Sequence, residues 1–176
     1  MKTDTNLSLV IMGVAGCGKS SLGAALAQRL NVELIEGDDH HSAANREKMQ
    51  RGTPLTDADR AGWLASLGGL LAQHSRVVLT CSALRRHYRE QLRNASPGLR
   101  FVFLDITPEQ ARERVAARAS HFFNSTLVDS QFATLETPVG EPGVLRVDAA
   151  EPLPQLVEQV IAWATVADPS QTPEAA

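Results

Sequence analysis

The sequence has little cysteine, no long apolar run and no excess of positive charge, and each absence argues against a class of protein. Only two of its 176 residues are cysteines, Cys17 and Cys81, and their positions match neither a zinc site nor a disulfide framework. We expect two reduced thiols, as is usual in the cytoplasm. No stretch reaches the roughly 20 apolar residues of a membrane span, and the polar start is unlike a signal peptide. The sequence therefore predicts a cytoplasmic protein with no membrane segment.

The charge balance also argues against nucleic acid as a partner. The net charge is -3 and the isoelectric point is about 5.9, whereas nucleic-acid binders usually carry a basic face. A local basic pocket for an anionic substrate remains compatible with this balance. The length suits one domain that buries about 70% of its unfolded surface. We expect residues 1–167 to form this domain and the polar residues 168–176 to be a disordered tail.

Short apolar runs alternate with helix-forming segments from end to end. We expect helices at seven segments, residues 20–30, 43–50, 56–73, 84–94, 108–118, 127–135 and 153–166. Strands are expected at residues 7–12, 32–35, 77–80, 99–104 and 144–147. This alternation predicts an α/β fold, with a five-stranded parallel sheet covered by helices on both faces.

A phosphate-binding motif follows the first expected strand and opens the first expected helix. Residues 13–20 read GVAGCGKS and satisfy the pattern GxxxxGK[ST]. Glycines allow the backbone N–H groups to turn toward phosphate oxygens, and the helix N-terminus adds positive charge. Lys19 is expected to reach the β- and γ-phosphates of ATP, and the Ser20 hydroxyl to bind Mg²⁺. The predicted ATP-binding residues are Gly13, Val14, Ala15, Gly16, Cys17, Gly18, Lys19, Ser20 and Ser21.

The phosphate-binding loop alone leaves switch, motor and kinase open. The sequence lacks the Asn-Lys-x-Asp motif with which GTPase switches read guanine, and it is short for an ATPase motor. A small kinase fits best, with a substrate segment after the second strand and an arginine-bearing lid around residues 114–138. The sequence thus favours a P-loop kinase.

Asp38 follows the second expected strand, on the edge of the sheet where the phosphate-binding loop lies. A carboxylate there can accept a hydroxyl proton or hold Mg²⁺ through water, although a helix cap is the alternative. Asp39 is more ambiguous, because it is also placed to cap the next helix. His40 and His41 lack a third metal ligand at suitable spacing, so a substrate contact is favoured for one of them.

Several arginines are candidates for binding anions. Arg114 and Arg118 lie four residues apart on one helical face, from which they can close over the nucleotide and stabilise transition-state charge. Arg60 can bind a carboxylate through a bidentate fork, and Arg85 lies close enough to the third strand to meet an anion. Solvated surface is the alternative for Arg85, Arg114 and Arg118, and it is the interpretation we favour for Arg89. Trp63 is expected in the core.

Six segments together resemble the gluconokinase family of small phosphate-loop kinases, over residues 7 to about 163. They are GVAGCGKS from Gly13, EGDDHH from Glu36, NREKMQRGTPLTDADRAGWL from Asn45, CSALRRHYR from Cys81, HFF from His121 and SQFATLETP from Ser130. The resemblance implies ATP-dependent phosphorylation of D-gluconate to 6-phospho-D-gluconate, an adenylate-kinase-like fold, a mobile lid and a homodimer. The chain departs from the family pattern at Ser42 and Gly62, where proline is usual, and at Arg85, where lysine is usual.

With gluconate as the substrate, the candidate residues take definite roles. We expect Lys19, Asp38 and Arg118 to be catalytic, with Asp38 taking the proton of the attacking hydroxyl. The substrate-binding candidates are Asp38, His41, Arg60, Arg85 and His121, and Arg114 is assigned to ATP. The alternatives are a shikimate- or nucleotide-type kinase on the same fold, and a nucleotide-binding regulator without turnover.

Overall fold

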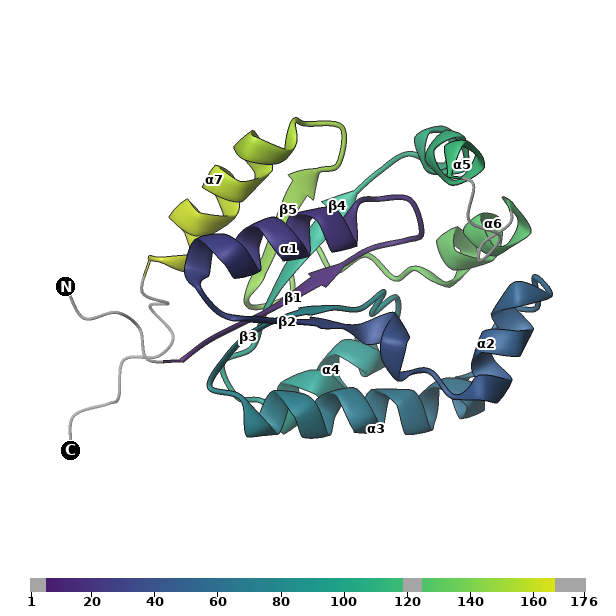
Figure 1. Cartoon of the computed structure of the whole chain (residues 1–176), viewed down its shortest axis with the longest axis horizontal. Coiled ribbons are helices and arrows are strands. Elements are labelled where there is room, and N and C mark those ends of the chain that lie inside the picture. Colours follow the sequence, from purple (N-terminus) through teal and green to yellow (C-terminus); the bar gives the residue numbers. More distant parts are fainter. Residues whose placement is uncertain (1–5, 119–124, 167–176) are drawn as a thin grey trace.

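A computed structural model describes residues 6–118 and 125–166. Within these ranges five parallel strands form a sheet in the order β2-β3-β1-β4-β5 (Figure 1). The strands are β1 Leu7–Met12, β2 Glu33–Glu36, β3 Arg76–Thr80, β4 Arg100–Asp105 and β5 Val144–Asp148. The helices are α1 Lys19–Leu30, α2 Ala43–Gln50, α3 Asp57–Gln73, α4 Arg86–Ala95, α5 Pro108–Ala117, α6 Ser125–Thr134 and α7 Leu153–Ala164, with a 3₁₀ turn η1 at Gly37–His40.

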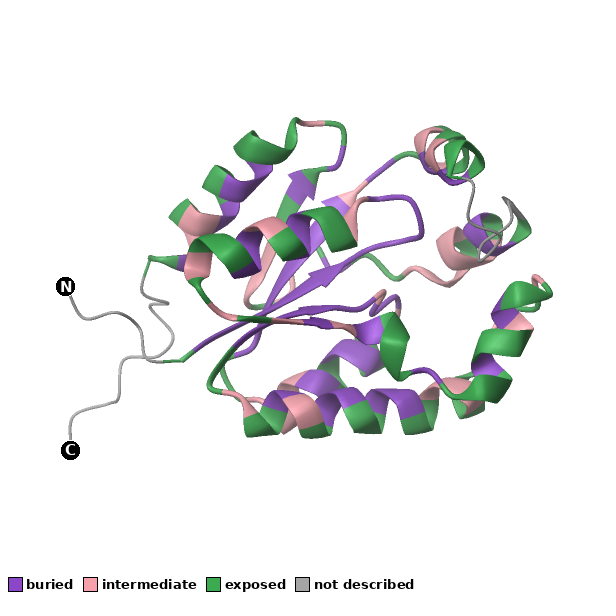
Figure 2. Cartoon of the chain, viewed as in Figure 1, coloured by how far each residue is buried: buried purple, intermediate pink, exposed green. Residues whose placement is uncertain are grey.

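The central strand β1 is buried along its whole length because helices cover both of its faces. Alternate side chains enter two separate cores. Leu9 and Ile11 pack with α1 and α7, whereas Val10 and Met12 pack with α3 and α4. In Figure 2 the strands are mostly buried, and the helices expose their outer sides. This arrangement fixes the carboxyl end of β1, from which the phosphate-binding loop emerges.

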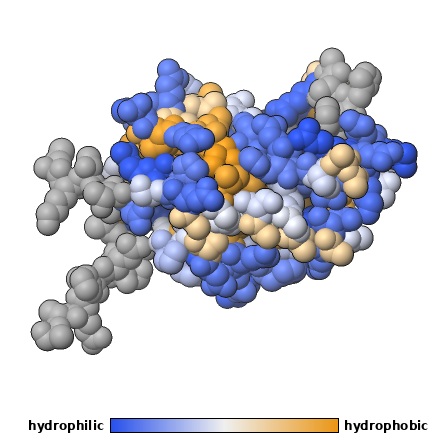
Figure 3. Space-filling view, turned by 60° about the horizontal axis from the view of Figure 1, so that its bottom comes forward, coloured by the Kyte–Doolittle hydropathy of each residue, from blue (hydrophilic) through white to orange (hydrophobic). Residues whose placement is uncertain are grey.

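The helices divide between the two faces of the sheet. Helices α1 and α7 lie on one face and α3 and α4 on the other, while α2, α5 and α6 lie toward the carboxyl ends of the strands (Figure 1). The face seen in Figure 3 is largely hydrophilic, with a hydrophobic area near its upper left. Among the described residues, no helix is long and apolar enough to cross a membrane.

The predicted parallel sheet with helices on both faces is confirmed. Helix α4 begins at Arg86 rather than at the expected residue 84. The reason is Arg85, the N-cap residue, whose extended backbone with φ of -103° and ψ of 149° delays the helix to the next residue. Residues 119–124 of the expected lid and the expected tail 168–176 lie outside the described residues, so the lid and the domain limits stay predictions.

Candidate active site

The phosphate-binding loop connects β1 to α1 and curls around its own lysine. The Lys19 Nζ atom donates to the carbonyl oxygens of Gly13 at 3.0 Å and Val14 at 3.1 Å. Gly18, with φ of 98°, is the N-cap of α1. A Cβ atom at Gly16 would lie 2.9 Å from the carbonyl oxygen of Ala111, so no side chain fits there. The loop is therefore a closed cradle at a helix N-terminus, the geometry that binds phosphate.

A carboxylate that the sequence analysis did not include in the site, that of Glu36, lies beside this loop. Glu36 ends β2, and its Oε2 atom accepts hydrogen bonds from Ser20 Oγ at 3.1 Å and Thr80 Oγ1 at 2.5 Å. The chain at Gly37 can lie this close to Thr80 only because glycine has no side chain, since a Cβ atom there would lie 2.2 Å from the carbonyl oxygen of Thr80. Hard oxygen donors of this kind suit Mg²⁺. The signal in the sequence was the position of Glu36, two residues before Asp38 at the same strand end.

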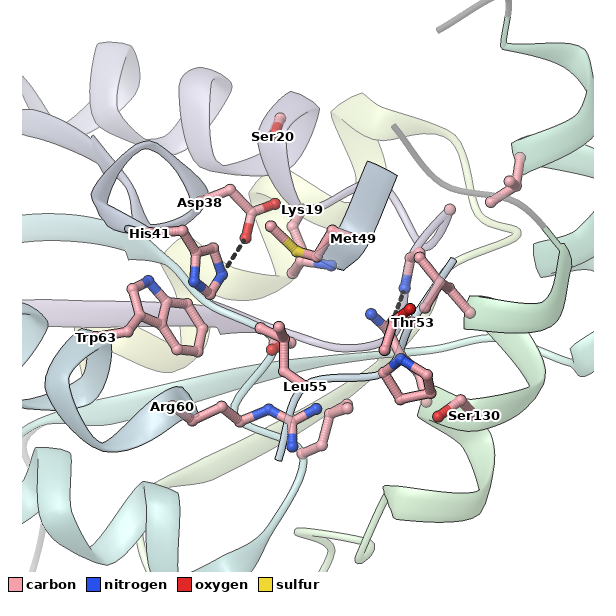
Figure 4. Close-up of a pocket in the computed structure, with 18 of the residues that line it drawn as sticks. Lys19, Ser20, Asp38, His41, Met49, Thr53, Leu55, Arg60, Trp63 and Ser130 are labelled. Carbon is pink, nitrogen blue, oxygen red and sulfur yellow. Dashed lines mark hydrogen bonds and ion pairs between the residues drawn. The ribbon is translucent and has the colours of Figure 1, made fainter. Parts of the chain in front are cut away.

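Asp38 and His41 form a pair at the base of the cleft. The His41 Nε2 atom lies 3.6 Å from Asp38 Oδ1 (Figure 4). On the other side of the ring, Asn45 Nδ2 lies 3.5 Å from His41 Nδ1. Because an amide nitrogen can only donate, Nδ1 accepts and Nε2 carries the hydrogen that faces Asp38. The histidine thus orients the carboxylate toward the cleft.

The electrostatics keep Asp38 ionised. Desolvation in the cleft raises the pKa of this carboxyl group. The hydrogen bond from His41 and the charge of Lys19 together lower it by more, so the pKa of Asp38 lies below the ordinary 3.8. The Asp38 side chain is also 60% exposed, so a ligand in the cleft can reach it. An ionised, accessible carboxylate near Lys19 can accept a proton or a hydrogen bond from a ligand.

Trp63 packs against the His41 ring of this pair. Its ring stacks on His41 with 4.1 Å between centroids, and its Nε1 atom donates to the Gly37 carbonyl oxygen at 2.7 Å. The expectation that Trp63 is a core residue is confirmed, because only 5% of it is exposed. It also lines the cleft, a contact that the sequence pattern did not indicate.

Arg60 and Arg85 differ in their surroundings. Arg60 lines the cleft beside Leu55, and its Nη1 atom donates to the Tyr88 hydroxyl at 3.2 Å (Figure 4). The Tyr88 hydroxyl in turn donates to Asp57. Arg85 is not among the lining residues; its Nε atom lies 4.0 Å from Asp57 Oδ1. Of the two, only Arg60 lines the cleft, where it is placed to meet a ligand.

Arg114 of α5 contacts the phosphate-binding loop, and Arg118, just after this helix, lines the cleft beside it. The Arg114 Nη1 atom donates to the carbonyl oxygens of Gly16 and Cys17, each at 3.4 Å, and its Nη2 atom donates to Ala149 at 2.7 Å. Arg118 follows the last residue of α5 and lines the cleft. The remaining candidates are less informative: Ser21 is exposed and does not line the cleft, and His121 lies outside the described residues.

The cleft joins these groups into one space. Its lining residues are Ala15, Gly16, Gly18, Lys19, Ser20, Asp38, His41, Met49, Thr53, Pro54, Leu55, Arg60, Trp63, Ser82, Leu84, Val115, Arg118, Leu127, Ser130 and Gln131. Gln131, which the site prediction missed, accepts from the Ala15 backbone N–H at 2.7 Å. Helix α6 is thereby tied to the phosphate-binding loop.

The structure excludes one alternative that the sequence left open, for Asp39, and contradicts the interpretation favoured for Arg89. Asp39 does not cap α2, because Ser42 is the N-cap and its Oγ atom accepts from the Asn45 N–H at 3.1 Å. Arg89 does not lie on a solvated surface, because none of its side chain is exposed. Helix α4 turns this arginine inward, where carbonyl and carboxylate oxygens surround it.

Comparisons with known proteins agree with this geometry. The family model described as an AAA domain matches residues 9–138. The chain is 43% identical to a gluconokinase of Gluconobacter oxydans, over 87% of this chain and 88% of that protein. It is 38% identical to the thermoresistant gluconokinase of Escherichia coli, over 86% and 90% respectively.

Solved structures give the same result. A gluconokinase from Sinorhizobium meliloti superposes with a TM-score of 0.85 and 45% identity, covering 92% of this chain and 93% of that one. Shikimate kinase from Aquifex aeolicus, at 16% identity and a TM-score of 0.58, shares the fold. The sequence identity over most of both chains, together with the phosphate-binding loop and the cleft beside it, shows that this chain belongs to the gluconokinase family.

Proposed function

We propose that this enzyme transfers the γ-phosphoryl group of ATP to the 6-hydroxyl of D-gluconate, giving 6-phospho-D-gluconate and ADP. The observation that carries the proposal is Asp38, an ionised carboxylate that lies in one cleft with Lys19 and Arg60. One end of the cleft has the phosphate-binding geometry, and the other has an arginine suited to a sugar-acid carboxylate. Membership of the gluconokinase family supports the same substrate.

The nucleotide binds through residues 13–20, with Lys19 at the β- and γ-phosphates. Ser20 and Glu36 offer the oxygen donors that fit Mg²⁺, directly or through water. When bound, the cation neutralises charge on the phosphate oxygens. Arg114 and Arg118 bind the nucleotide from the other side, and Arg118 stabilises the phosphoryl group in transfer. The cation proposal is tested by chelation, which should abolish turnover until Mg²⁺ is restored.

Gluconate lies over the carboxyl ends of β2 and β3. Arg60 binds the carboxylate, His41 contacts a hydroxyl, and Arg85 and His121 are further candidates for substrate contact. Asp38 accepts the proton of the 6-hydroxyl while the oxygen of that hydroxyl bonds to the γ-phosphorus. The bond from that phosphorus to the β–γ bridging oxygen breaks, and ADP leaves. Catalysis is mainly positioning and charge stabilisation, and closure of the lid excludes water.

A substrate panel separates this reaction from its rivals. We expect ADP release from ATP with D-gluconate, and little with shikimate, a nucleoside monophosphate or no acceptor. Release with shikimate or the nucleotide instead would favour the alternative kinases. Tight ATP binding without ADP release for any acceptor would favour a regulator without turnover.

The assembly and the location belong to the same proposal. We propose a homodimer with no nucleic-acid partner, supported by the resemblance and by the net charge of -3. Sedimentation analysis that gives the mass of one chain at all concentrations would refute the dimer. The cytoplasm is the proposed compartment, since Cys17 and Cys81 are free thiols and ATP is the phosphoryl donor. Fractionation of cells would test it.

A further inference from the structure

Arg89 on α4 is fully buried and lies outside the cleft. Its Nε and Nη2 atoms donate to the two carboxylate oxygens of Glu141 at 3.0 Å and 2.6 Å. Its Nη2 atom also donates to the Glu136 carbonyl oxygen at 3.0 Å, and its Nη1 atom donates to the Ala83 carbonyl oxygen at 2.7 Å. A buried ion pair adds little stability over a well-packed apolar pair. The main effect of Arg89 is therefore to hold the backbone groups that it contacts in place.

The contact with Ala83 is unusual because Ala83 has a left-handed backbone. Its φ is 46°, and among the described residues the only other non-glycine residue with positive φ is Asn31. Asparagine adopts this region with relative ease, whereas alanine does so only where surrounding contacts impose it. The bond from Arg89 to the Ala83 carbonyl oxygen is such a contact.

The residues on either side of Ala83 form part of the active-site wall. Ser82 and Leu84 both line the cleft. The Ser82 carbonyl oxygen accepts from the N–H of Gly13, the first residue of the phosphate-binding loop, at 3.3 Å. The Leu84 carbonyl oxygen accepts from the Glu136 N–H at 2.8 Å, in the segment that follows α6. The carbonyl groups of three successive residues thus accept hydrogen bonds from three different parts of the molecule. Arg89 donates to the middle one, that of Ala83.

We propose that Arg89 is a positioning residue for phosphoryl transfer. Its guanidinium fixes the left-handed turn at Ala83, and through it the wall formed by Ser82 and Leu84 between the phosphate-binding loop and the segment after α6. The planar fork of arginine suits this role, because it reaches a carbonyl group on one side and a carboxylate on the other. Arg89 touches neither ATP nor gluconate. The inference rests on the proposed gluconate kinase activity.

Arg93 provides a matched control on the same helix. Its Nη2 atom donates to Glu141 Oε2 at 3.0 Å and to the Pro142 carbonyl oxygen, and its side chain makes no hydrogen bond to the described residues 82–84. Arg89→Gln and Arg93→Gln each remove an ion pair with Glu141, so both are expected to lower the melting temperature. Only Arg89→Gln is expected to lower kcat/KM for gluconate, by about tenfold or more, with ATP affinity changed less than about threefold.

A second substitution separates positioning from a general loss of packing. Glycine adopts a φ near 46° without restraint. Ala83→Gly should therefore recover much of the kcat/KM that Arg89→Gln loses, without restoring the melting temperature lost with the ion pair. Should Arg89→Gln not fold, Arg89→Lys takes its place. The ammonium group keeps the charge but cannot bond to the Ala83 carbonyl group and the Glu141 carboxylate together.

The outcomes are distinct. Unchanged kcat/KM in a folded Arg89 variant, equal losses for the Arg89 and Arg93 variants, or no recovery with Ala83→Gly would each overturn the positioning role. A wild-type enzyme that does not phosphorylate gluconate would instead refute the proposed function.

Discussion

At the scale of single residues, the proposed chemistry depends on Asp38 and the groups that keep it ionised. We predict that Asp38→Asn lowers kcat by about 100-fold or more, because the amide cannot accept the hydroxyl proton. ATP binding should persist, since the phosphate-binding loop is unchanged. Steady-state kinetics and nucleotide titration measure the two effects. Near-normal turnover would remove Asp38 from the mechanism.

Arg60 is predicted to determine the affinity for the sugar acid. Loss of a charged hydrogen-bonding group at a carboxylate costs roughly 10- to 100-fold in affinity, so Arg60→Ala should raise the KM for gluconate by that factor. The KM for ATP should change little. Arg85→Ala is the comparison, because Arg85 lies outside the cleft lining and is expected to have the smaller effect. Equal increases in both KM values for Arg60→Ala would argue against the carboxylate contact.

Residues with a local sequence signature were predictable, and residues that act through distant contacts were not. Lys19 follows from the loop motif, and Asp38 follows from its place after a strand. Glu36 ends the same strand that Asp38 follows, but that position does not reveal its contact with Thr80, which is 44 residues away in the sequence. Arg89 was missed because its partner Glu141 is 52 residues away. Nothing local distinguishes an arginine that a helix turns inward from one that faces solvent.

At the scale of elements, the end of α3 should respond to pH. His74 ends this helix, and its Nδ1 and Nε2 atoms lie 2.7 Å from the Leu70 carbonyl oxygen and 3.0 Å from Glu33 Oε2. Both neighbours are acceptors, so only the imidazolium form, in which both ring nitrogens donate, makes both bonds. The bond to Leu70 and then the carboxylate of Glu33 raise the pKa of His74 above 6.5, against desolvation.

The sign of the effect follows from this raised pKa. The imidazolium stabilises the fold fully below the ordinary pKa, and the stabilisation is lost as the pH rises through the folded value. His74→Ala should therefore lower the melting temperature more at about pH 5.5 than at about pH 8.5. Thermal denaturation at the two pH values measures it. A pH-independent loss, or a larger loss at the higher pH, would show that His74 contributes only packing.

Two adjacent glycines of α3 provide a test of its packing. A Cβ atom at Gly69 would meet nothing within 4 Å, whereas one at Gly68 would lie 3.2 Å from the Ala95 Cβ atom of α4. Because alanine is the better helix former, Gly69→Ala should stabilise the fold by about 1 kcal/mol. Gly68→Ala should gain less or lose stability, because α3 and α4 must move apart. Urea denaturation gives both values, and equal gains would mean that the two helices are not closely packed there.

At the scale of the whole molecule, the class of fold was predictable because apolar runs alternate with helical segments. The order β2-β3-β1-β4-β5 was not, because it depends on which strands pair across long stretches of sequence. That order places the end of β3 between β1 and β2. There Thr80 bonds to Glu36, and the Ser82 carbonyl oxygen accepts from the N–H of Gly13 in the phosphate-binding loop. The cleft therefore results from the sheet as a whole.

The product of the reaction tests the account most directly. Proton-coupled phosphorus NMR of an incubation with ATP, Mg²⁺ and D-gluconate identifies the carbon that receives the phosphoryl group. Transfer to the 6-hydroxyl predicts a phosphomonoester signal split into a triplet by the two protons of the carbon-6 methylene, together with ADP. A doublet from a secondary hydroxyl, or inorganic phosphate alone, would contradict the proposed chemistry.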